Sequence, residues 1–490
     1  MPKLPTVAIA LLASATLVAA RQSDRTPDAL LDRQLDVVVP RTLEMTKTPS
    51  VSVAVVRDGA LVLARAWGRA RLEPSRPATP DMRYLIGSVT KQFTAAALLL
   101  LQEDGRLSLD DRVARHLPDV AHADQITIRQ LLSHTAGYDD YWPQDYAPQY
   151  IFKTADVPQI IHDWAGRPLT FTPGAAWEYS NTNYVIAGAI VEKVSGVPFF
   201  QFLRTRIFEP LKMRSVFDYA RNVLPSTDAA AYTAFALGPI RPATREANAW
   251  LFAAGNLAMT TKDLASWDLS MISKTLLKEA SYREQRTEAR RTDAVRTNYG
   301  LGISLTPSMG RRTVSHLGGG SGFSSANYVF PDDRAAVIVL SNGDSPRAVW
   351  SIAEFINRSL FSPKPLPAQP EEEARVRPPI AAGLGGSRPE PMKARRIFEG
   401  LQKGQLDRAL FTDNANAFFT KQALADFAAG LAPLGPATYL WQTSESKRAG
   451  MIARVFQAWF PDRTIHITTL ETRDARLEQF AIDLAPPQWR

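Results

Sequence analysis

Cysteine is absent from this 490-residue chain. That absence excludes disulfide bonds, a thiolate nucleophile and any metal site with cysteine ligands. The six histidines form neither an H-E-x-x-H motif nor a close pair, so the sequence predicts no zinc site. No serine stands in the G-x-S-x-G pattern of the alpha/beta hydrolases. We therefore expect no metal, no organic cofactor and no catalytic serine of that type.

Long apolar runs are scarce as well. The run Val7–Ala19 is short for a bilayer crossing, follows the basic Lys3, and ends in the small residues Val18-Ala19-Ala20. We expect residues 1–20 to be a cleaved secretory signal, which would place the mature chain in the bacterial periplasm or outside the cell. An uncleaved anchor is the alternative. No later run reaches about eighteen apolar residues, so no stable membrane span is expected after signal cleavage.

Basic clusters are also missing, although the formal net charge is +8. No basic run is interleaved with aromatic residues and no nucleic-acid-binding motif occurs, so nucleic acid is not an expected partner. The contents of 45% hydrophobic and 22% charged residues are ordinary for a globular protein. A chain of this length is expected to form roughly two or three domains.

Strand patterns lie near both ends of the larger N-terminal part, and helical patterns lie between them. Asp58-Gly59 separates two β-rich runs, which is a strong hairpin signal. A helix is expected from about Ser88, further helices over 110–211, a second hairpin about Pro331-Asp332-Asp333, and a closing helix over 346–360. These features predict an α/β (α+β) sandwich. Its antiparallel sheet is assembled from distant segments, is flanked by helices, and carries an inserted all-helical domain.

We place this first domain at residues 25–361. A stretch rich in proline and glycine at 362–391 predicts a linker. Beyond it, residues 392–490 show helical patterns followed by four β-rich runs, which predict a C-terminal α+β accessory domain. That order of elements resembles the cone-shaped domains of the nuclear-transport-factor-like superfamily. Its apolar stripe fits either a ligand pocket or a plain core, and a core is the simpler interpretation.

Ser88 and Lys91 form an S-x-x-K motif at the start of the predicted helix. Residues three apart share one helix face, roughly 5–6 Å from each other, so the amine can serve as base for the hydroxyl. Burial and the helix dipole both lower a lysine pKa towards neutrality. The motif alone is a weak signal, because the polar stretch from Ser444 to Lys447 also fits it. We interpret that second copy as accidental.

Two further motifs follow in the chain. Tyr179-Ser180-Asn181 precedes a predicted helix, and His316-Leu317-Gly318 opens a glycine-rich stretch before the second hairpin. The motifs S-x-x-K, Y-x-N and H-x-G, in this order and on these elements, resemble those of the serine β-lactamase superfamily. The closest branch holds class C β-lactamases, D-alanyl-D-alanine carboxypeptidases, D-aminopeptidases and related esterases. The resemblance spans about residues 40–360 and extends to stretches such as LLSHTAGY, AAGNLAMTTKDLASW and YGLGI.

The resemblance implies a catalytic scheme. Ser88 would attack a carbonyl carbon and become acylated, while Lys91 and Tyr179 would share the proton transfers. Asn181 would form a hydrogen bond to Lys91 or to the substrate amide. The backbone N–H groups of Ser88 and Gly319 would form the oxyanion hole, and water would then release the acyl group.

One departure from the pattern affects the expected substrate. His316 stands where familiar class C β-lactamases carry a lysine, whose fixed positive charge suits a substrate carboxylate. A histidine supplies a hydrogen bond and only a fractional charge near pH 7. Gly318 and Gly319 should let a substrate approach the strand closely. We therefore expect a serine hydrolase of esters or of D-amino-acid amides and peptides, with weak β-lactam hydrolysis beside it.

Other interpretations stay open. The chain could be a dedicated class C-like β-lactamase or DD-carboxypeptidase, or a penicillin- or cell-wall-binding protein that hydrolyses its adduct very slowly. Tyr179 could be a core residue, Asn181 a helix cap, and His316 a packing residue, while His134 is expected mainly to order a loop. The expected partner is a small-molecule or peptide substrate with a scissile acyl bond, bound near the loop Tyr138–Phe152. The sequence does not fix the oligomeric state.

Overall fold

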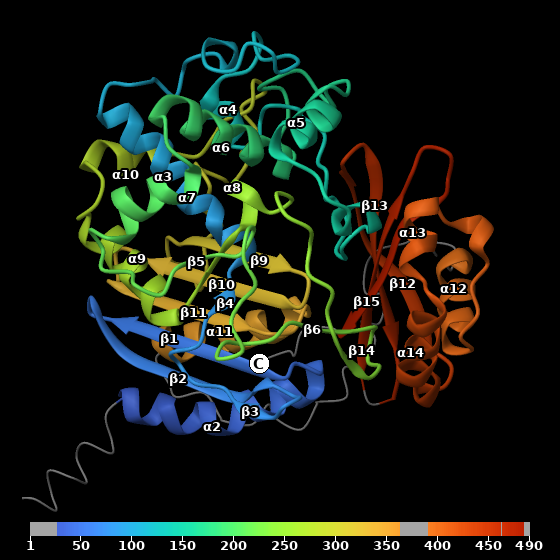
Figure 1. Cartoon of the computed structure of the whole chain (residues 1–490). Coiled ribbons are helices and arrows are strands. Elements are labelled where there is room, and N and C mark those ends of the chain that lie inside the picture. The colour runs from blue at the N-terminus through green and yellow to red at the C-terminus, as the bar shows by residue number, and fades with distance from the viewer. Residues whose placement is uncertain (1–26, 363–390, 462, 485–490) are drawn as a thin grey trace, which may run out of the picture.

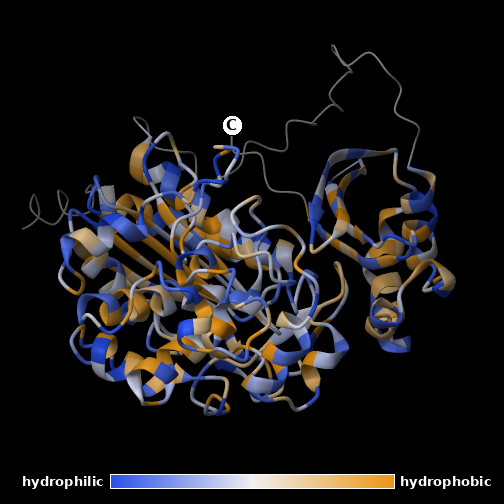
Figure 2. Ribbon diagram, turned by 90° about the horizontal axis from the view of Figure 1, so that it is seen from above, coloured by the Kyte–Doolittle hydropathy of each residue, from blue (hydrophilic) through white to orange (hydrophobic). Residues whose placement is uncertain are grey.

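The computed structural model describes residues 27–362, 391–461 and 463–484. They form a large lobe and a smaller C-terminal lobe beside it, which Figures 1 and 2 show from two directions. The expected signal at 1–20 lies outside the described residues, as does nearly all of the expected linker at 362–391. Both therefore stay predictions.

A six-stranded antiparallel sheet forms the middle of the large lobe, in the order β3-β2-β1-β11-β10-β9. Strands from opposite ends of the lobe pair directly, so that Val53 of β1 stands opposite Val339 of β11. The predicted sheet of distant segments is thereby confirmed. Its strands are β1 (Ser50–Arg57), β2 (Ala60–Arg71), β3 (Arg76–Pro77), β9 (Val314–Gly320), β10 (Phe323–Phe330) and β11 (Ala335–Ser341).

Both predicted hairpins are present. Asp58 and Gly59 join β1 to β2 with φ angles of 53° and 78°. Two successive positive φ angles are what a two-residue type I′ turn requires, and this explains why an Asp-Gly pair stands there. The second hairpin joins β10 to β11 through residues 331–334.

Helices cover both faces of the sheet, so strand β1 is apolar on both of its sides. Val53 and Val55 face the core that α2 and α11 cover, whereas Ala54 and Val56 face the core on the α3 and α9 side. Figure 1 shows these two layers with the sheet between them. The four helices are α2 (Pro27–Thr46), α3 (Thr90–Glu103), α9 (Thr261–Ser273) and α11 (Pro346–Phe361).

The segment inserted between β3 and β9 departs from the all-helical expectation in one respect. It is mostly helical, but it also holds a three-stranded sheet, β4-β8-β5, and a β6-β7 pair. Strands of two or three residues are too short for a periodic pattern to reveal. Besides α3 and α9, the inserted elements are β4 (Tyr84–Leu85), α4 (Ile128–Leu132), α5 (Val157–Ala165), α6 (Asn181–Ser195), α7 (Phe199–Leu203), β5 (Phe217–Asp218), β6 (Tyr232–Ala234), β7 (Ile240–Pro242), α8 (Phe252–Gly255), β8 (Leu257–Met259) and α10 (Glu279–Gln285).

Among the described residues, no single helix combines the length and the apolar character needed to cross a membrane. One bent pair, Asn181–Ser195 with Phe199–Phe208, reaches that standard by length and composition when the two are taken together. Most side chains of Asn181–Ser195 are buried in the core of the large lobe.

The C-terminal lobe packs helices against a four-stranded antiparallel sheet, β12-β13-β14-β15. It has its own core, which includes Phe398, Leu401, Phe427 and Ile467. Helices precede strands in this lobe, as predicted for an α+β domain. The similarity of the lobe to the nuclear-transport-factor-like superfamily stays a prediction. The elements are α12 (Met392–Gln402), α13 (Asp413–Phe418), α14 (Lys421–Leu431), β12 (Tyr439–Arg448), β13 (Met451–Trp459), β14 (Thr464–Glu471) and β15 (Leu477–Leu484).

Candidate active site

Ser88 lies in a single 3₁₀ turn, Gly87–Val89, that leads directly into α3. The backbone N–H of Ile86 donates to the carbonyl of Leu257 at 2.9 Å and so fixes the entry to this turn. The Ser88 side chain is half-buried, whereas Lys91, one helical turn further on, is completely buried. The hydroxyl is thus reachable from solvent and its neighbouring amine is not.

Three oxygen atoms surround the Lys91 amine. Its Nζ lies 3.0 Å from Ser88 Oγ, 2.8 Å from Asn181 Oδ1 and 2.8 Å from the backbone oxygen of Ala254. An ammonium can donate to all three. A neutral amine can keep two of these bonds, to Asn181 and Ala254, and turn its lone pair towards the Ser88 hydroxyl. The same geometry therefore suits both protonation states of the lysine.

Burial lowers the pKa of Lys91 from 10.5 to about 7, and the negative charge of Asp140 opposes this shift. Removing the amine from water penalises its charged form, which is the usual cause of such a shift. Near neutral pH a substantial share of the lysine is uncharged. An uncharged amine can accept a proton from Ser88, so Lys91 has the properties of a general base.

Tyr179 adjoins both Ser88 and Lys91. Its ring centroid is 4.9 Å from Lys91 Nζ, and its side chain is half-buried. Burial raises the pKa of the Tyr179 phenol, while a hydrogen bond with the Ser88 side chain acts in the opposite direction. The phenol therefore keeps its proton at neutral pH. This favours Lys91 as the resting base and Tyr179 as the proton donor to a leaving group.

Asn181 is aimed at Lys91 by Asp140. The backbone N–H and Nδ2 of Asn181 donate to Asp140 Oδ1 at 2.9 and 3.0 Å, which leaves Oδ1 of Asn181 facing the lysine. Asn181 is the first residue of α6 and Ser180 is its N-cap. The side chain of Asn181 thus positions the amine and does not cap the helix.

His316 stands in strand β9 as a neutral side chain. Burial, followed by the charge of Lys91, lowers the pKa of His316 to about 3. Its Nδ1 lies 2.6 Å from the Leu317 carbonyl oxygen and its Nε2 lies 2.9 Å from the Tyr299 hydroxyl. We assign the proton to Nδ1, so that Tyr299 donates to Nε2. The third motif therefore offers hydrogen bonding and no positive charge.

The backbone of β9 runs directly beside the turn that carries Ser88. A Cβ atom added to Gly87 would lie 2.5 and 2.6 Å from the oxygen and nitrogen of Gly319, and one added to Gly318 would overlap the carbonyl of Ile86. A Cβ added to Gly319 would meet nothing within 4 Å. The close approach brings the Gly319 backbone next to Gly87, the residue before Ser88, and is compatible with the oxyanion hole that the motif resemblance implies.

His134 packs against the Tyr179 side chain. It is buried, and its ring centroid lies 4.3 Å from that of Tyr179. Its Nδ1 accepts from the backbone N–H of Ser180 at 3.2 Å. Burial holds the pKa of His134 well below its usual value. These contacts suit a residue that orders the Tyr179 segment, as the sequence led us to expect, and they do not point to a proton acceptor for substrate.

Sequence reasoning assigned no role to Asp140, Ala254 or Tyr299. Asp140 and Tyr299 do lie in stretches that the sequence brings to notice, the aromatic loop Tyr138–Phe152 and the YGLGI stretch. Ala254 contributes only its backbone carbonyl. A carbonyl group belongs to every residue, so no pattern of residue types could have revealed this contact.

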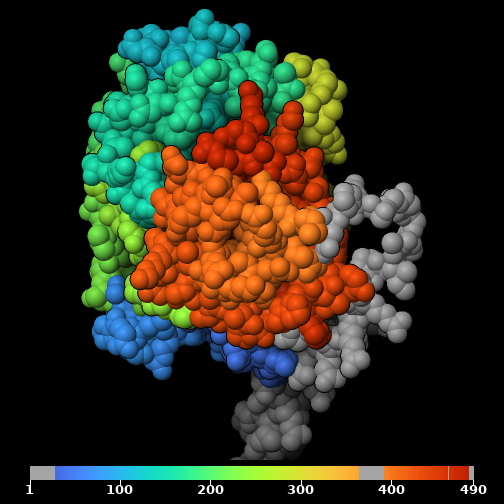
Figure 3. Space-filling model, turned by 90° about the vertical axis from the view of Figure 1, so that its right-hand side faces the viewer, coloured from blue at the N-terminus to red at the C-terminus, as the bar shows by residue number. Residues whose placement is uncertain are grey.

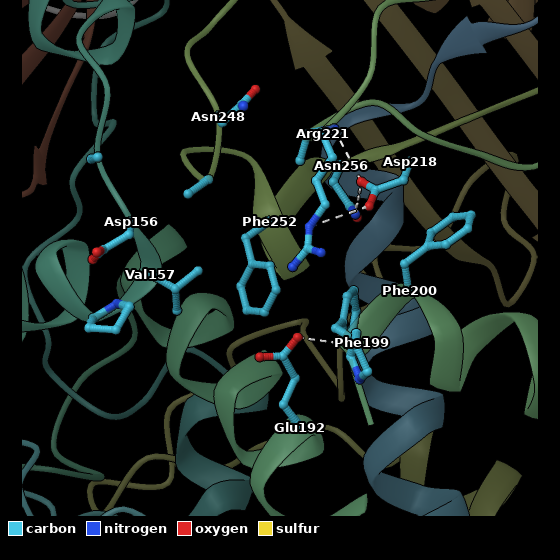
Figure 4. Close-up of a pocket in the computed structure, with 15 residues that line it drawn as sticks. Asp156, Val157, Glu192, Phe199, Phe200, Asp218, Arg221, Asn248, Phe252 and Asn256 are labelled. Carbon is cyan, nitrogen blue, oxygen red and sulfur yellow. Dashed lines mark hydrogen bonds and ion pairs between the residues drawn. The ribbon is translucent and has the colours of Figure 1, made fainter. Parts of the chain in front are cut away.

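A separate cavity of about 590 Å³ borders α8 (Figure 4). Aromatic and charged side chains line it, among them Phe252, Glu192 and Arg221, and none of the motif residues does. Two helices join it to the site: α8, whose Ala254 carbonyl contacts Lys91, and α6, which carries both Asn181 and Glu192. Throughout residues 27–362, 391–461 and 463–484, no group of three or more His, Asp or Glu side chains could hold a metal ion.

Comparison with known proteins places this geometry in context. The profile of the family described as Beta-lactamase matches residues 35–356. Penicillin-binding protein 4* of Bacillus subtilis (strain 168) is 29% identical over 344 residues, which are 66% of this chain and 75% of that protein. The D-amino acid amidase of Ochrobactrum anthropi SV3, solved with L-phenylalanine amide, is 25% identical with a TM-score of 0.58, covering 67% of this chain and 97% of that one.

A third similarity reaches beyond the large lobe. The octameric penicillin-binding protein homologue from Pyrococcus abyssi has a TM-score of 0.60 and 21% identity, covering 91% of this chain and 98% of that one. At this identity it shows a shared fold alone. The three motifs, their geometry and these similarities identify the chain as an enzyme, a serine hydrolase. Because the profile match spans well over half of its length, the chain belongs to the Beta-lactamase family.

Proposed function

We propose that this enzyme hydrolyses ester bonds or D-amino-acid amide and peptide bonds through an acyl-enzyme formed on Ser88. One observation carries the proposal: the buried Lys91 amine lies 3.0 Å from Ser88 Oγ, with its pKa lowered to about 7. Similarity to the D-amino acid amidase and to a D-stereospecific amidohydrolase from Streptomyces sp. supports the choice of acyl group. The latter is 29% identical, with a TM-score of 0.56.

In the acylation step, neutral Lys91 takes the proton from Ser88 Oγ as that oxygen bonds to the substrate carbonyl carbon. The carbonyl oxygen becomes an oxyanion, held by the N–H groups of Ser88 and Gly319. The bond from carbon to the leaving oxygen or nitrogen then breaks. Tyr179 gives its proton to the leaving group and is reprotonated from the Lys91 ammonium, so the proton taken from Ser88 is passed on.

Deacylation runs along the same path in reverse. A water molecule takes the place of the leaving group and gives a proton to the Lys91 and Tyr179 pair as its oxygen bonds to the acyl carbon. The bond to Ser88 Oγ then breaks and the hydroxyl recovers its proton. The products are a carboxylic acid and the free enzyme.

The neutral third motif bears on the choice among related activities. A dedicated β-lactamase or DD-carboxypeptidase binds substrates that carry a carboxylate, and neutral His316 supplies no charge for it. This favours ester and amide hydrolysis, with weak β-lactam hydrolysis beside it. A penicillin-binding protein that does not turn over would instead give a burst of product without a steady rate.

The test compares wild type with Ser88→Ala on p-nitrophenyl esters, on D- and L-phenylalanine amide and on a chromogenic cephalosporin. We expect steady turnover of esters and of the D-amide, and a loss on the order of 10³-fold or more in Ser88→Ala. Ser444→Ala is the matched control, because Ser444 begins the second S-x-x-K copy on exposed strand β12. A fluorophosphonate should label wild type and the control but not Ser88→Ala. Equal labelling of all three, or a burst without turnover, would overturn the proposal.

We also propose that the enzyme is exported to the periplasm or beyond. Lys3, the apolar run Val7–Ala19 and the small residues that end it support this location. N-terminal sequencing of protein from the extracytoplasmic fraction should find the chain starting after Ala20. Recovery of the full-length chain from the cytoplasm would contradict the proposal.

A further inference from the structure

The cavity beside α8 belongs to the large lobe alone. Figure 3 shows the C-terminal lobe lying over the large lobe, but none of the described residues of the C-terminal lobe lines this cavity. The lining residues all fall between 155 and 256. The volume of about 590 Å³ lies within the range of pockets that hold small molecules, roughly 300–1,000 Å³. A molecule bound here would be separate from the catalytic serine.

One polar atom of the lining is buried without a partner. Asn256 is 2% exposed, and its Nδ2 donates to Asp218 Oδ1 at 2.9 Å. The Oδ1 atom of Asn256 has no hydrogen-bond partner among the described residues. Buried acceptors are nearly always satisfied in folded proteins, because an unmatched acceptor costs free energy. Asn256 Oδ1 is therefore available to accept from an N–H group of a ligand.

A positive charge stands beside the other oxygen of the same carboxylate. Arg221 Nε lies 4.0 Å from Asp218 Oδ2, and the Arg221 side chain is 67% exposed. Figure 4 shows Asp218, Asn256 and Arg221 grouped at one end of the cavity, with the guanidinium of Arg221 extending into it. The ion pair of Arg221 runs through Nε, so its Nη groups can donate to a ligand carboxylate.

Most of the remaining lining is apolar. Phe199, Phe200 and Phe252 contribute their rings, and the ring centroids of Phe199 and Phe252 lie 5.3 Å apart. Two further carboxylates each accept from a backbone N–H group: Asp156 caps α5, and Glu192 accepts from Phe199 at 2.8 Å. Their negative charges would repel an acidic side chain of a ligand, whereas an apolar side chain would be buried against the rings.

We propose that this cavity binds a free α-amino acid with a large apolar side chain. An α-amino acid carries its ammonium and its carboxylate on one carbon atom, and Asn256 and Arg221 likewise flank one carboxylate, that of Asp218. The ammonium would donate to Asn256 Oδ1, and the carboxylate would accept from the Nη groups of Arg221. The side chain would lie against the phenylalanine rings. This second site goes beyond the proposed acyl-enzyme function and does not rest on it.

Titration calorimetry of the whole enzyme with D-phenylalanine and with L-phenylalanine tests the proposal. We expect at least one enantiomer to bind. The partial ligands 2-phenylethylamine, 3-phenylpropionate and glycine each lack one of the three groups and should bind about tenfold or more weakly. Arg221→Gln should weaken the binding of phenylalanine about tenfold or more, as loss of a charge-assisted contact does. Arg221→Lys should recover part of the loss, because it restores the charge without the forked donors.

Arg214→Gln is the matched control, because Arg214 is an exposed arginine close by in the chain that does not line the cavity. It should leave binding unchanged, and an equal loss in both variants would show a long-range effect of charge and overturn the proposal. Binding that Arg221→Gln does not weaken would lie elsewhere, the catalytic site included, and would also overturn it. So would the absence of binding, or a partial ligand that binds as tightly as phenylalanine. Calorimetry needs no turnover, so a failure of the proposed acyl-enzyme chemistry is a separate result.

Discussion

At the scale of single residues, the proposed nucleophile Ser88 and the proposed base Lys91 differ in their exposure to solvent. Ser88 and Tyr179 are half-buried, whereas Lys91 is completely buried. A lysine exposed to water would remain charged near neutral pH and could not accept a proton. Burial is therefore the physical cause of reactivity here, and Asp140 limits how far the pKa falls.

This origin of reactivity predicts the pH dependence. Lys91 must be neutral to take the Ser88 proton, so kcat/KM for a neutral ester should rise with pH through an apparent pKa near 7. Below that value the slope should approach tenfold per pH unit, because one proton is lost. His316, with its pKa lowered to about 3, adds no step in this range. A profile that is flat from pH 5 to 9 would count against Lys91 as the base.

The variant Asp140→Asn tests the role of Lys91 by removing the negative charge near its amine. The negative charge of Asp140 raises the pKa of Lys91, so removing that charge should lower it. The rising limb of the profile should then move to lower pH in steady-state measurements. The amide keeps the size of the side chain and an oxygen that can accept from Asn181. Movement of the limb to higher pH would show that another group is titrating.

At the scale of elements, one close approach of two backbones forms the proposed oxyanion hole. The 3₁₀ turn before α3 and strand β9 come from segments over 200 residues apart, yet their backbones meet at Gly87 and Gly319. Gly87 has a φ of 49°, a conformation that side chains with a Cβ rarely adopt. Both the backbone angle and the space beside it thus require glycine at this position.

Gly87→Ala should therefore disable the site. Its Cβ would push against the Gly319 backbone, displace the N–H proposed for the oxyanion hole, and lower kcat roughly 10²-fold or more. Gly105→Ala is the matched control, because Gly105 has a φ of 71° at the far end of α3 and open space around it. The positive φ should cost each variant about 1–2 kcal/mol in free energy of unfolding, and Gly87→Ala should lose more, because its Cβ also meets the Gly319 backbone. Only Gly87→Ala should lose activity, and equal losses of activity would contradict this account.

At the scale of the whole molecule, the sequence predicts each lobe better than their contact. The paired strands, the helix after Ser88 and the motif order all follow from local patterns. The docking of Asp145 on Arg448 joins residues that lie 303 positions apart, and neither has a periodic or motif signal. The sequence assigned no role to Asp140 or Arg448 for that reason, because the role of each depends on a neighbour that only folding brings close.

Aromatic packing is the second means by which the lobes are joined. Tyr146 of the loop 138–152 stacks on Phe418 of α13, with ring centroids 4.0 Å apart and an interplanar angle of 20°. Phe418 also contacts Phe235 of the large lobe at 5.4 Å between centroids. The hydroxyl of Tyr146 donates to the carbonyl of Glu478. Through this loop, the C-terminal lobe supports Asp140 and so the geometry around Lys91.

Phe418→Ala should therefore loosen the loop without touching the catalytic groups. An aromatic pair is worth about 0.5–1.5 kcal/mol beyond the area it buries, so we expect faster hydrogen exchange in residues 138–152 and a higher KM. Tyr439→Ala is the control, because Tyr439 is 53% exposed at the opposite end of β12 from Arg448. It should leave exchange in the loop unchanged. If Phe418→Ala also leaves exchange in the loop unchanged, the stack of Tyr146 on Phe418 does not hold the loop, and this account of its support is wrong.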